Sequence, residues 1–195
     1  MELIYQKGAT TIDLDEVEYL IPKHIELQAE LNEWEQANIL AAKVWLETQK
    51  IELTSFATIN FCKLLHKKMF DKTWTWAGKF RKTNKNIGID WLQVSVALKN
   101  LFDDLISQIQ NNSYQTDEIA ARFHHKLVHI HAFSNGNGRH ARLATDYMLT
   151  ILGNKIFSWG RHDLTSKNDT RKRYIKALQA ADKGEYQPLV VFVRS

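Results

Sequence analysis

The chain has 195 residues, of which 44% are hydrophobic and 11% aromatic, enough to bury the core of one compact domain. Its 26 Lys and Arg residues against 22 Asp and Glu residues give a net charge of +4, which suits a nucleotide or an acidic partner but does not indicate nucleic acid binding. The single cysteine, Cys62, excludes an internal disulfide and a cysteine-rich zinc site. Because no signal peptide and no apolar run of roughly 20 residues is present, we expect a cytoplasmic protein without a membrane partner.

The N-terminal part of the chain predicts one long helix. A short helical pattern, 15–21, should end at Pro22, and from Lys23 to about Gln49 apolar residues recur at helical spacing without Gly or Pro. These apolar residues are Ile25, Leu27, Leu31, Trp34, Ala37, Ala41 and Trp45. The opposite face carries Glu26, Glu30, Glu33 and Glu35, and the simplest interpretation is a solvated acidic face.

A second helix should begin at a cap formed by Thr54 or Ser55 and run to about Phe70, with Cys62 and His66 as core or rim residues. Residues 74–91 then break the helical pattern with two glycines, β-branched residues and four Lys or Arg residues. This composition predicts an irregular segment or a short hairpin, whose edge could pair with an extended peptide. A basic loop anchored by its tryptophans is the alternative.

Helical patterns return in the second half of the chain. They predict helices over Leu92–Gln110, Asp117–Ile130 capped by Thr116, Arg139–Leu152 ended by Gly153, and Thr165–Ala181, followed by a last segment Gln187–Val193. The fold class is therefore all-α, with six to eight helices and one irregular excursion before Leu92.

Residues 131–142, His-Ala-Phe-Ser-Asn-Gly-Asn-Gly-Arg-His-Ala-Arg, concentrate the chemistry of the chain. The two glycines around Asn137 allow a tight turn that brings backbone N–H groups close to an anion at the start of a helix. Arg139 and Arg142 lie three residues apart, so they share a helix face and can hold two phosphate groups. The pattern indicates a phosphate cradle with His131 just before the turn.

The histidines admit a second interpretation, because His125 and His129 have the spacing of a two-histidine metal face. The glutamate that a zinc protease needs directly after the first histidine is Lys126 here. We therefore do not expect a metal held by histidines alone.

The run 131–142 resembles the signature of the Fic (Fido, or Fic/DOC) family, His-x-Phe-x-acidic-Gly-Asn-Gly-Arg-x-x-Arg, at every fixed position except Asn135. Trp76-Ala-Gly-Lys-Phe-Arg81 and Asn86-Ile-Gly88 resemble the flap of that family. Residues 30–39 and the Asn-Gly-Asn-Gly sequence are similar to a subgroup called mobile mystery protein B. The resemblance implies a Fic-type helical core over 53–195 with a short β-hairpin flap, and a helical extension over 1–52 that could be regulatory.

The resemblance also implies a function: transfer of AMP from ATP, as a protein adenylyltransferase, to a Ser, Thr or Tyr hydroxyl of a target protein. His131 would take the hydroxyl proton, and Arg139 and Arg142 would bind the β- and γ-phosphates. The backbone of Gly136, Asn137 and Gly138 would form an anion hole. The flap would hold the target as an added strand through Lys79, Arg81, Asn86, Ile87 and Gly88.

Asn135 stands where the family has an acidic residue that holds Mg²⁺, so it would be a weak metal ligand, and Mg²⁺ would arrive with ATP. Two alternatives therefore stay open: a non-catalytic module that binds a nucleotide or partner, and a kinase-like or toxin-like member acting on a translation factor. The inhibitory motif of many relatives, Ser/Thr-x-x-x-Glu-Gly/Asn, has no match, and Glu30 is the nearest candidate to reach Arg142. An antitoxin or regulatory partner and a homodimer are both compatible with the resemblance.

Overall fold

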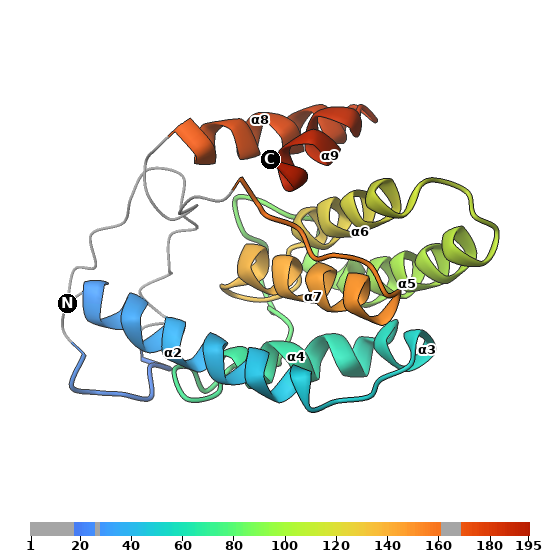
Figure 1. Ribbon diagram of the computed structural model, residues 1–195. Helices are drawn as coiled ribbons and strands as arrows, with labels where there is room; N and C mark the ends of the chain where they lie inside the picture. The colour runs from blue at the N-terminus through green and yellow to red at the C-terminus, as the bar shows by residue number, and fades with distance from the viewer. Residues whose placement is uncertain (1–17, 26–27, 161–168) are drawn as a thin grey trace.

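The computed structural model describes residues 18–25, 28–160 and 169–195 of the chain. Every regular element in these ranges is a helix, which confirms the all-α fold (Figure 1). The helices are α2 (Gln28–Glu47), α3 (Leu53–Phe56), α4 (Ile59–Phe70), the 3₁₀ helix η1 (Trp91–Gln93), α5 (Val94–Gln110), α6 (Thr116–Ile130), α7 (Asn137–Ile151), α8 (Asp169–Asp182) and α9 (Gln187–Arg194). Most of the helical pattern predicted at 15–21, and the predicted start of the helix at Thr165, lie outside the described residues.

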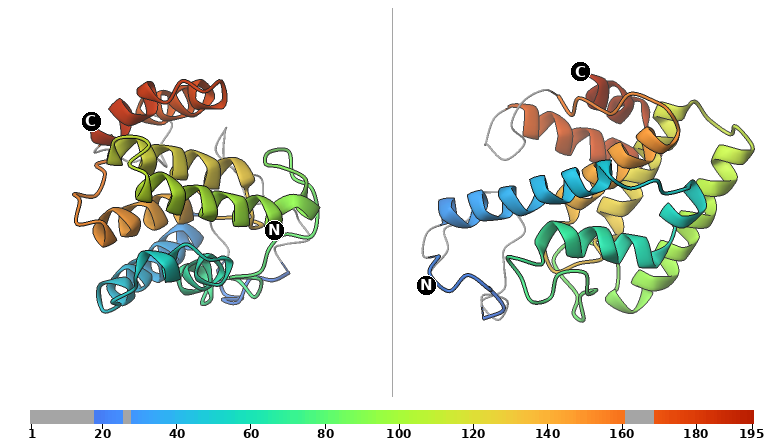
Figure 2. Two further views of the ribbon diagram at one scale, coloured as in Figure 1. Left: turned by 90° about the vertical axis from the view of Figure 1, so that its right-hand side faces the viewer. Right: turned by 60° about the horizontal axis from the view of Figure 1, so that its bottom comes forward.

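Helix α6 is central: it packs against α5 and α7, and α8 and α9 cover another side of it. Helix α4 packs on α7 and is covered in turn by α2. Figures 1 and 2 show α2 and α4 running side by side at one end of the molecule and α8 and α9 at the other. The loop that joins α6 to α7 reaches α4, where Phe133 stacks on His66 with ring centroids 3.7 Å apart.

The buried face of α2 differs from the face that the sequence predicted. Trp34 is 41% exposed, and Ala37 and Ala41 are exposed as well, whereas Glu35 and Asn38 are buried. The stripe that packs on the core consists of Leu31, Glu35, Asn38, Ala42 and Leu46. The side chain of Asn38 serves the end of α4, because it bonds the carbonyl of Lys68 and the N–H of Lys72. Polar side chains on this stripe have buried partners, so the apolar pattern placed Ile25 and Leu31 correctly but missed Glu35 and Asn38.

The second predicted helix is divided in two. The hydroxyl of Thr58 accepts a hydrogen bond from the N–H of Phe61, so the cap of α4 is Thr58 and not Thr54 or Ser55. The bounds of α6 match the prediction within one residue, and α7 begins at Asn137, two residues earlier than predicted. Gly153 follows α7 with a φ of 71°, as expected for a left-handed helix end.

Residues 74–91 do not form the expected hairpin. In the part of the chain that the structure describes, the only bridges are Leu20 with Trp74 and Phe80 with Phe133. The N–H of Arg81 donates to the carbonyl of Ala132 at 3.0 Å. The segment therefore pairs with the loop before α7 instead of with itself.

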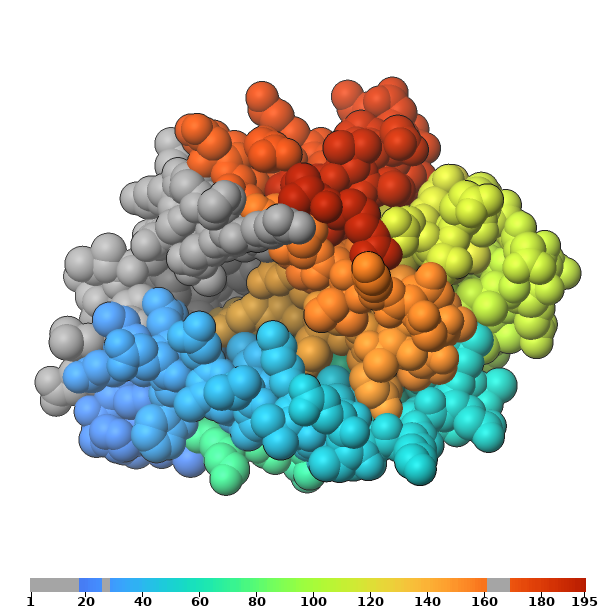
Figure 3. All heavy atoms as spheres, viewed as in Figure 1, coloured from blue at the N-terminus to red at the C-terminus, as the bar shows by residue number. Residues whose placement is uncertain are grey.

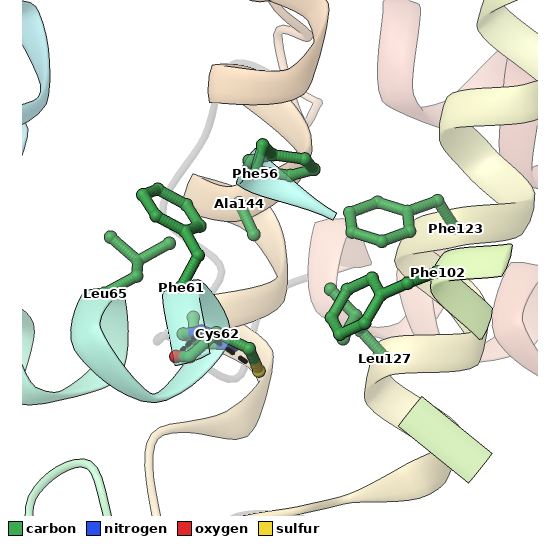
Figure 4. Close-up of a pocket in the computed structure, with 9 residues that line it drawn as sticks. Phe56, Phe61, Cys62, Leu65, Phe102, Phe123, Leu127 and Ala144 are labelled. Atoms are coloured by element: carbon green, nitrogen blue, oxygen red, sulfur yellow. Dashed lines mark hydrogen bonds between the residues drawn. The ribbon is translucent and has the colours of Figure 1, made fainter. Parts of the chain in front are cut away.

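The centre of the molecule is apolar and tightly filled (Figure 4). Its side chains come from α3 to α7: Phe56, Phe61, Cys62, Leu65, Phe102, Phe123, Leu127, His140 and Ala144. They enclose a void of about 10 Å³, which is at the limit of what one water molecule needs. Burial raises the pKa of the Cys62 thiol to about 12, so Cys62 is a core residue, as predicted.

Candidate active site

His131 ends α6 in the left-handed conformation, with a φ of 53°. A residue without glycine's freedom is strained there, and the structure holds it in place. The Nε atom of Arg81 donates to the carbonyl of His131 at 2.6 Å. The imidazole stays close to the last turn of α6, where it bonds the backbone of Val128.

The protonation state of His131 follows from its hydrogen bonds. The ring bonds the backbone of Val128, and among the described residues its buried Nε2 has no partner, so the bond is made by Nδ1. Burial, followed by the charges of Arg81 and Lys85, lowers the pKa of His131 to about 4. At neutral pH the ring is therefore uncharged, with its proton on Nδ1 and a free lone pair on Nε2.

The predicted flap lies against this histidine. A Cβ on Gly88, whose φ is 96°, would stand 2.5 Å from the Cβ of His131, so only glycine allows this approach. Asn86 and Ile87, beside it, are exposed. The backbone that would pair with a target strand is thus next to His131.

Arg81 has a different place from the one that the sequence suggested. Its side chain is 3% exposed, and besides His131 it donates to the carbonyls of Thr83 at 2.8 Å and of Ile89. All three nitrogens of the guanidinium group donate to backbone carbonyls, and a role of Arg81 in binding a target stays a prediction. Through these hydrogen bonds Arg81 connects residues 83–89 to the end of α6. Lys79, in contrast, is exposed.

The glycine turn packs directly on α4. A Cβ on Gly136, with a φ of 75°, would lie 2.4 Å from the Cζ of Phe70, so this position requires glycine. The side chain of Asn137 is buried, accepts from the N–H of Phe133 at 2.9 Å and donates to its carbonyl at 2.8 Å. The Asn137 side chain therefore braces the loop, and only its backbone is free to bind a nucleotide.

Asn135 is tied to its neighbours on both sides. Its Oδ1 accepts from the N–H of Gly136 at 2.6 Å, so in this state that N–H is not available to an anion. Its carbonyl accepts from Nε2 of His66 at 3.1 Å, and Nδ1 of His66 accepts from the N–H of Gly78 at 3.0 Å. Burial holds the pKa of His66 well below 6.5. This neutral histidine joins the signature loop to the segment before the flap.

The start of α7 has the character of an anion site. The helix carries no side-chain cap, and the first helical N–H groups are those of Asn137 and Gly138. A Cβ on Gly138 would meet only Nη1 of Arg142, at 3.8 Å, so this guanidinium lies beside the first turn. Arg139 and Arg142 are close enough for their charges to interact, so two cations lie near the N-terminal end of α7.

Arg142 is oriented by α8. The hydroxyl of Tyr174 hydrogen-bonds Arg142 and also contacts Nε2 of His124 at 2.9 Å. Burial lowers the pKa of Arg142, and Tyr174 and Asp146 oppose that shift. Arg142 is thus held in place by an aromatic hydroxyl.

Arg139 already has an anionic partner. Its Nη1 contacts Oε2 of Glu35 at 2.5 Å, and its guanidinium lies 5.0 Å from the ring centroid of Phe70. The other oxygen of Glu35 accepts from the indole N–H of Trp74 at 2.8 Å. The carboxylate that contacts Arg139 is therefore that of Glu35, whereas Glu30 is exposed and its pairing with Arg142 stays a prediction.

No group of three or more metal-binding side chains occurs within the described ranges. His125 bonds a carboxylate of α8, with its Nε2 2.8 Å from Oδ1 of Asp182, and His129 lies 3.7 Å from the same oxygen. These two histidines tie α6 to α8.

Figure 3 shows the loop region before α7, in gold, recessed behind the blue atoms of α2.

Comparisons with known proteins agree with this geometry. Residues 55–149 match the sequence profile of the Fic/DOC family. These residues are a Fic/DOC family domain. The chain is 32% identical over 96 residues to the protein adenylyltransferase Fic of Aedes aegypti, a match that covers 49% of the chain and 18% of that relative. The chain therefore spans less than a fifth of the length of this curated relative.

Solved structures show the same fold. Fic-1 of C. elegans has a TM-score of 0.67 at 25% identity, over 93% of the chain and 52% of that structure. BepC of Bartonella tribocorum, determined with bound AMPPNP, has a TM-score of 0.66 at 20% identity, over 93% of the chain and 97% of that structure. At that level of identity the likeness to BepC concerns the fold alone.

The Fic domain contains most of the site, but Glu35 lies outside the matched residues. Sequence reasoning missed Glu35, His66 and Tyr174. A signal for Glu35 was present, since a glutamate four residues after Leu31 lies on the same helix face as that buried leucine. His66 and Tyr174 carried no such signal.

No helix in the described part of the chain is long and apolar enough to span a membrane.

Proposed function

We propose that this chain is a protein adenylyltransferase, which moves AMP from ATP to a Ser, Thr or Tyr hydroxyl of a target protein. The observation that carries the proposal is His131, a buried neutral imidazole with an unused Nε2 lone pair, fastened beside an exposed flap backbone. Arg139, Arg142 and the open end of α7 supply the phosphate site. The name of the Aedes aegypti relative supports the same activity.

The proposed step begins with the target hydroxyl on the flap. Its oxygen attacks the α-phosphorus of ATP while Nε2 of His131 accepts its proton. The bond from the α-phosphorus to the bridging oxygen breaks, and pyrophosphate leaves. With a pKa near 4, His131 is a weak base in the free protein, and nearby phosphates would raise that pKa and strengthen it.

The arginines would orient the triphosphate. Arg142, held by Tyr174, lies beside the N–H groups of Asn137 and Gly138, so these groups can bind adjacent phosphate oxygens. Arg139 can join them more strongly when it leaves Glu35, because the carboxylate occupies Nη1 and neutralises the charge of the guanidinium. We infer that Glu35 competes with ATP for Arg139 and holds the free protein in a state of low affinity.

The residues present provide only a partial site for Mg²⁺. Asn135 offers a neutral oxygen that already accepts from the N–H of Gly136, and no cluster of three or more metal-binding side chains is found among the described residues. Mg²⁺ would reach the site on the phosphates of ATP and supply charge neutralisation there. Asn135 would contribute a single ligand at most.

Labelling with ATP that carries ³²P on either the α- or the γ-phosphate tests the proposal. The chain would be mixed with a cell extract, and labelled proteins would be separated on a denaturing gel. Label from the α-phosphate alone supports adenylyl transfer. Label from the γ-phosphate alone would show a kinase. ATP binding without label would show a non-catalytic module, an alternative that is considered because Asn135 replaces the acidic residue of the signature.

A further inference from the structure

A second surface feature lies outside the phosphate site. It is a groove of about 420 Å³ between α4 and residues 74–79. Its lining comprises Lys63, Leu64, Lys67, Asp71, Trp74, Thr75, Ala77, Gly78 and Lys79. Three cations and one carboxylate face this groove, which is here called the lysine groove.

The three lysines are brought together by one close backbone approach. A Cβ on Gly78 would lie 2.8 Å from the Cβ of Lys67 and 2.9 Å from the carbonyl of Lys63. Its φ of 77° and this contact both require glycine. Lys79 therefore follows directly beside the two lysines of α4, and Figure 2 shows the green segment after α4 returning along the helix.

The ammonium groups have no carboxylate partner of their own among the described residues. Lys63 lies 4.3 Å from the ring centroid of Phe80, and Lys79 donates to the carbonyl of Thr75 at 3.2 Å. Both contacts hold the stems in place without neutralising the charge. Asp71 is the single acidic residue of the lining, so the groove is positive.

The spacing of the lysines matches an extended peptide. Lys63 and Lys67 lie four residues apart on α4, which places them about 6 Å apart along the helix axis. Alternate residues of an extended chain are about 6.6 Å apart. Acidic side chains at every second position can therefore meet both lysines.

We propose that the lysine groove binds an extended acidic segment of a partner protein, in which acidic residues alternate with others. On the proposed function, which this inference builds upon, the partner is the protein that receives AMP. The groove ends at Lys79, where the flap begins, and the flap reaches His131 at Gly88. A target held in the groove would be delivered to the flap.

Binding can be measured without ATP, so its outcome does not depend on catalysis. The probe is a fluorescein-labelled ten-residue peptide in which Glu alternates with Ser, and its control has Gln for Glu. By fluorescence anisotropy at low salt, the Glu peptide should bind at least about tenfold more tightly than the Gln peptide, and added salt should weaken it. Equal binding of the two peptides would overturn the proposal.

The location is tested with two variants of equal net charge. The triple variant Lys63→Glu, Lys67→Glu, Lys79→Glu should lose at least about tenfold in affinity for the Glu peptide. A second triple variant reverses exposed lysines on other elements, Lys126→Glu, Lys155→Glu and Lys183→Glu, and should stay within about twofold of wild type. Equal losses in both variants would show attraction by net charge alone and contradict a groove.

A wild-type measurement guards against misfolding of the groove variant. A carbodiimide joins carboxylates to contacting lysines without a spacer, and mass spectrometry of the digested adduct locates the bond. The Glu peptide should be joined to Lys63, Lys67 or Lys79, and bonds mainly at other lysines would overturn the proposal. If ATP labelling occurs, the Glu peptide should also be labelled faster than the Gln peptide, and equal rates would remove the link to the target.

Discussion

Glu35 of α2 and Arg139 of α7 form an ion pair across 104 residues of sequence, with Oε2 and Nη1 2.5 Å apart. Glu35 is 4% exposed and receives a second bond from Trp74, so its carboxylate is fixed. Among the described residues, Arg139 is the signature arginine that forms an ion pair with a carboxylate. The pair therefore connects the helix outside the matched Fic residues to the proposed phosphate site.

Replacing the carboxylate should release Arg139. In Glu35→Gln the amide oxygen can still accept from Trp74, but the charged bond to Arg139 is lost. We expect ATP affinity, measured by isothermal titration calorimetry, to rise roughly tenfold. The exposed Glu33→Gln is the matched control and should bind ATP as wild type does. Unchanged affinity in Glu35→Gln would show that the pair is structural only.

The two glycines of the turn should respond in opposite ways to alanine. Gly136→Ala meets Phe70 and a positive φ, and should lose about 2–4 kcal/mol of unfolding free energy. Gly138→Ala has no close neighbour and lies in α7, so it should gain about 0.5–1 kcal/mol. It should nevertheless weaken ATP binding, because the new methyl group stands beside Nη1 of Arg142. Urea unfolding and calorimetry measure both effects, and a Gly138→Ala protein with full ATP affinity would place the nucleotide elsewhere.

Asn135 should limit the use of Mg²⁺. Asn135→Asp keeps an acceptor for the N–H of Gly136 and adds a negative charge, so labelling at low Mg²⁺ should increase several-fold. Asn135→Ala removes the acceptor and should not increase labelling. A rate for Asn135→Asp at or below wild type, with the fold intact by circular dichroism, would argue against metal binding at this position.

Buried histidines should make the protein sensitive to acid. Burial lowers the pKa of His140 to about 4 and that of His124 to about 3, below the ordinary value of 6.5. Between pH 6.5 and the lowered pKa values, the unfolded chain binds more protons than the folded chain. The full stability is therefore present above pH 6.5 and is lost as the pH falls. For His140 the loss by pH 4 is about 3 kcal/mol.

Urea unfolding at several pH values between 7.5 and 4.5 measures this loss. It should be smaller in His140→Gln, which removes one titrating group. A free energy of unfolding that stays constant down to pH 4.5 would contradict the burial of these rings.

The helices were predictable where periodic apolar residues and capping signals agree, as for α6. The face of α2 was not, because Glu35 and Asn38 are polar residues whose partners, Arg139 and the end of α4, come from distant segments. A helix pattern does not show which polar group is buried with a partner.

The signature was predictable as a motif, but the role of each side chain within it was not. Asn137 and Arg81 look like binding residues in the sequence, yet Asn137 bonds backbone groups of its own loop and Arg81 donates to the carbonyls of Thr83 and His131. The missing hairpin has the same origin, since Phe80 pairs with Phe133 instead of with its own segment. Contacts across loops depend on the folded arrangement and leave little trace in local sequence.

The most direct test of the account compares Glu35→Gln with the double variant Glu35→Gln, His131→Ala. Both would be incubated with a cell extract and ATP labelled on the α-phosphate, after calorimetry has shown that they bind ATP equally. We expect labelled proteins with Glu35→Gln and almost none with the double variant, because Nε2 of His131 accepts the hydroxyl proton. Equal labelling by the two variants, or no label from Glu35→Gln despite ATP binding, would contradict it.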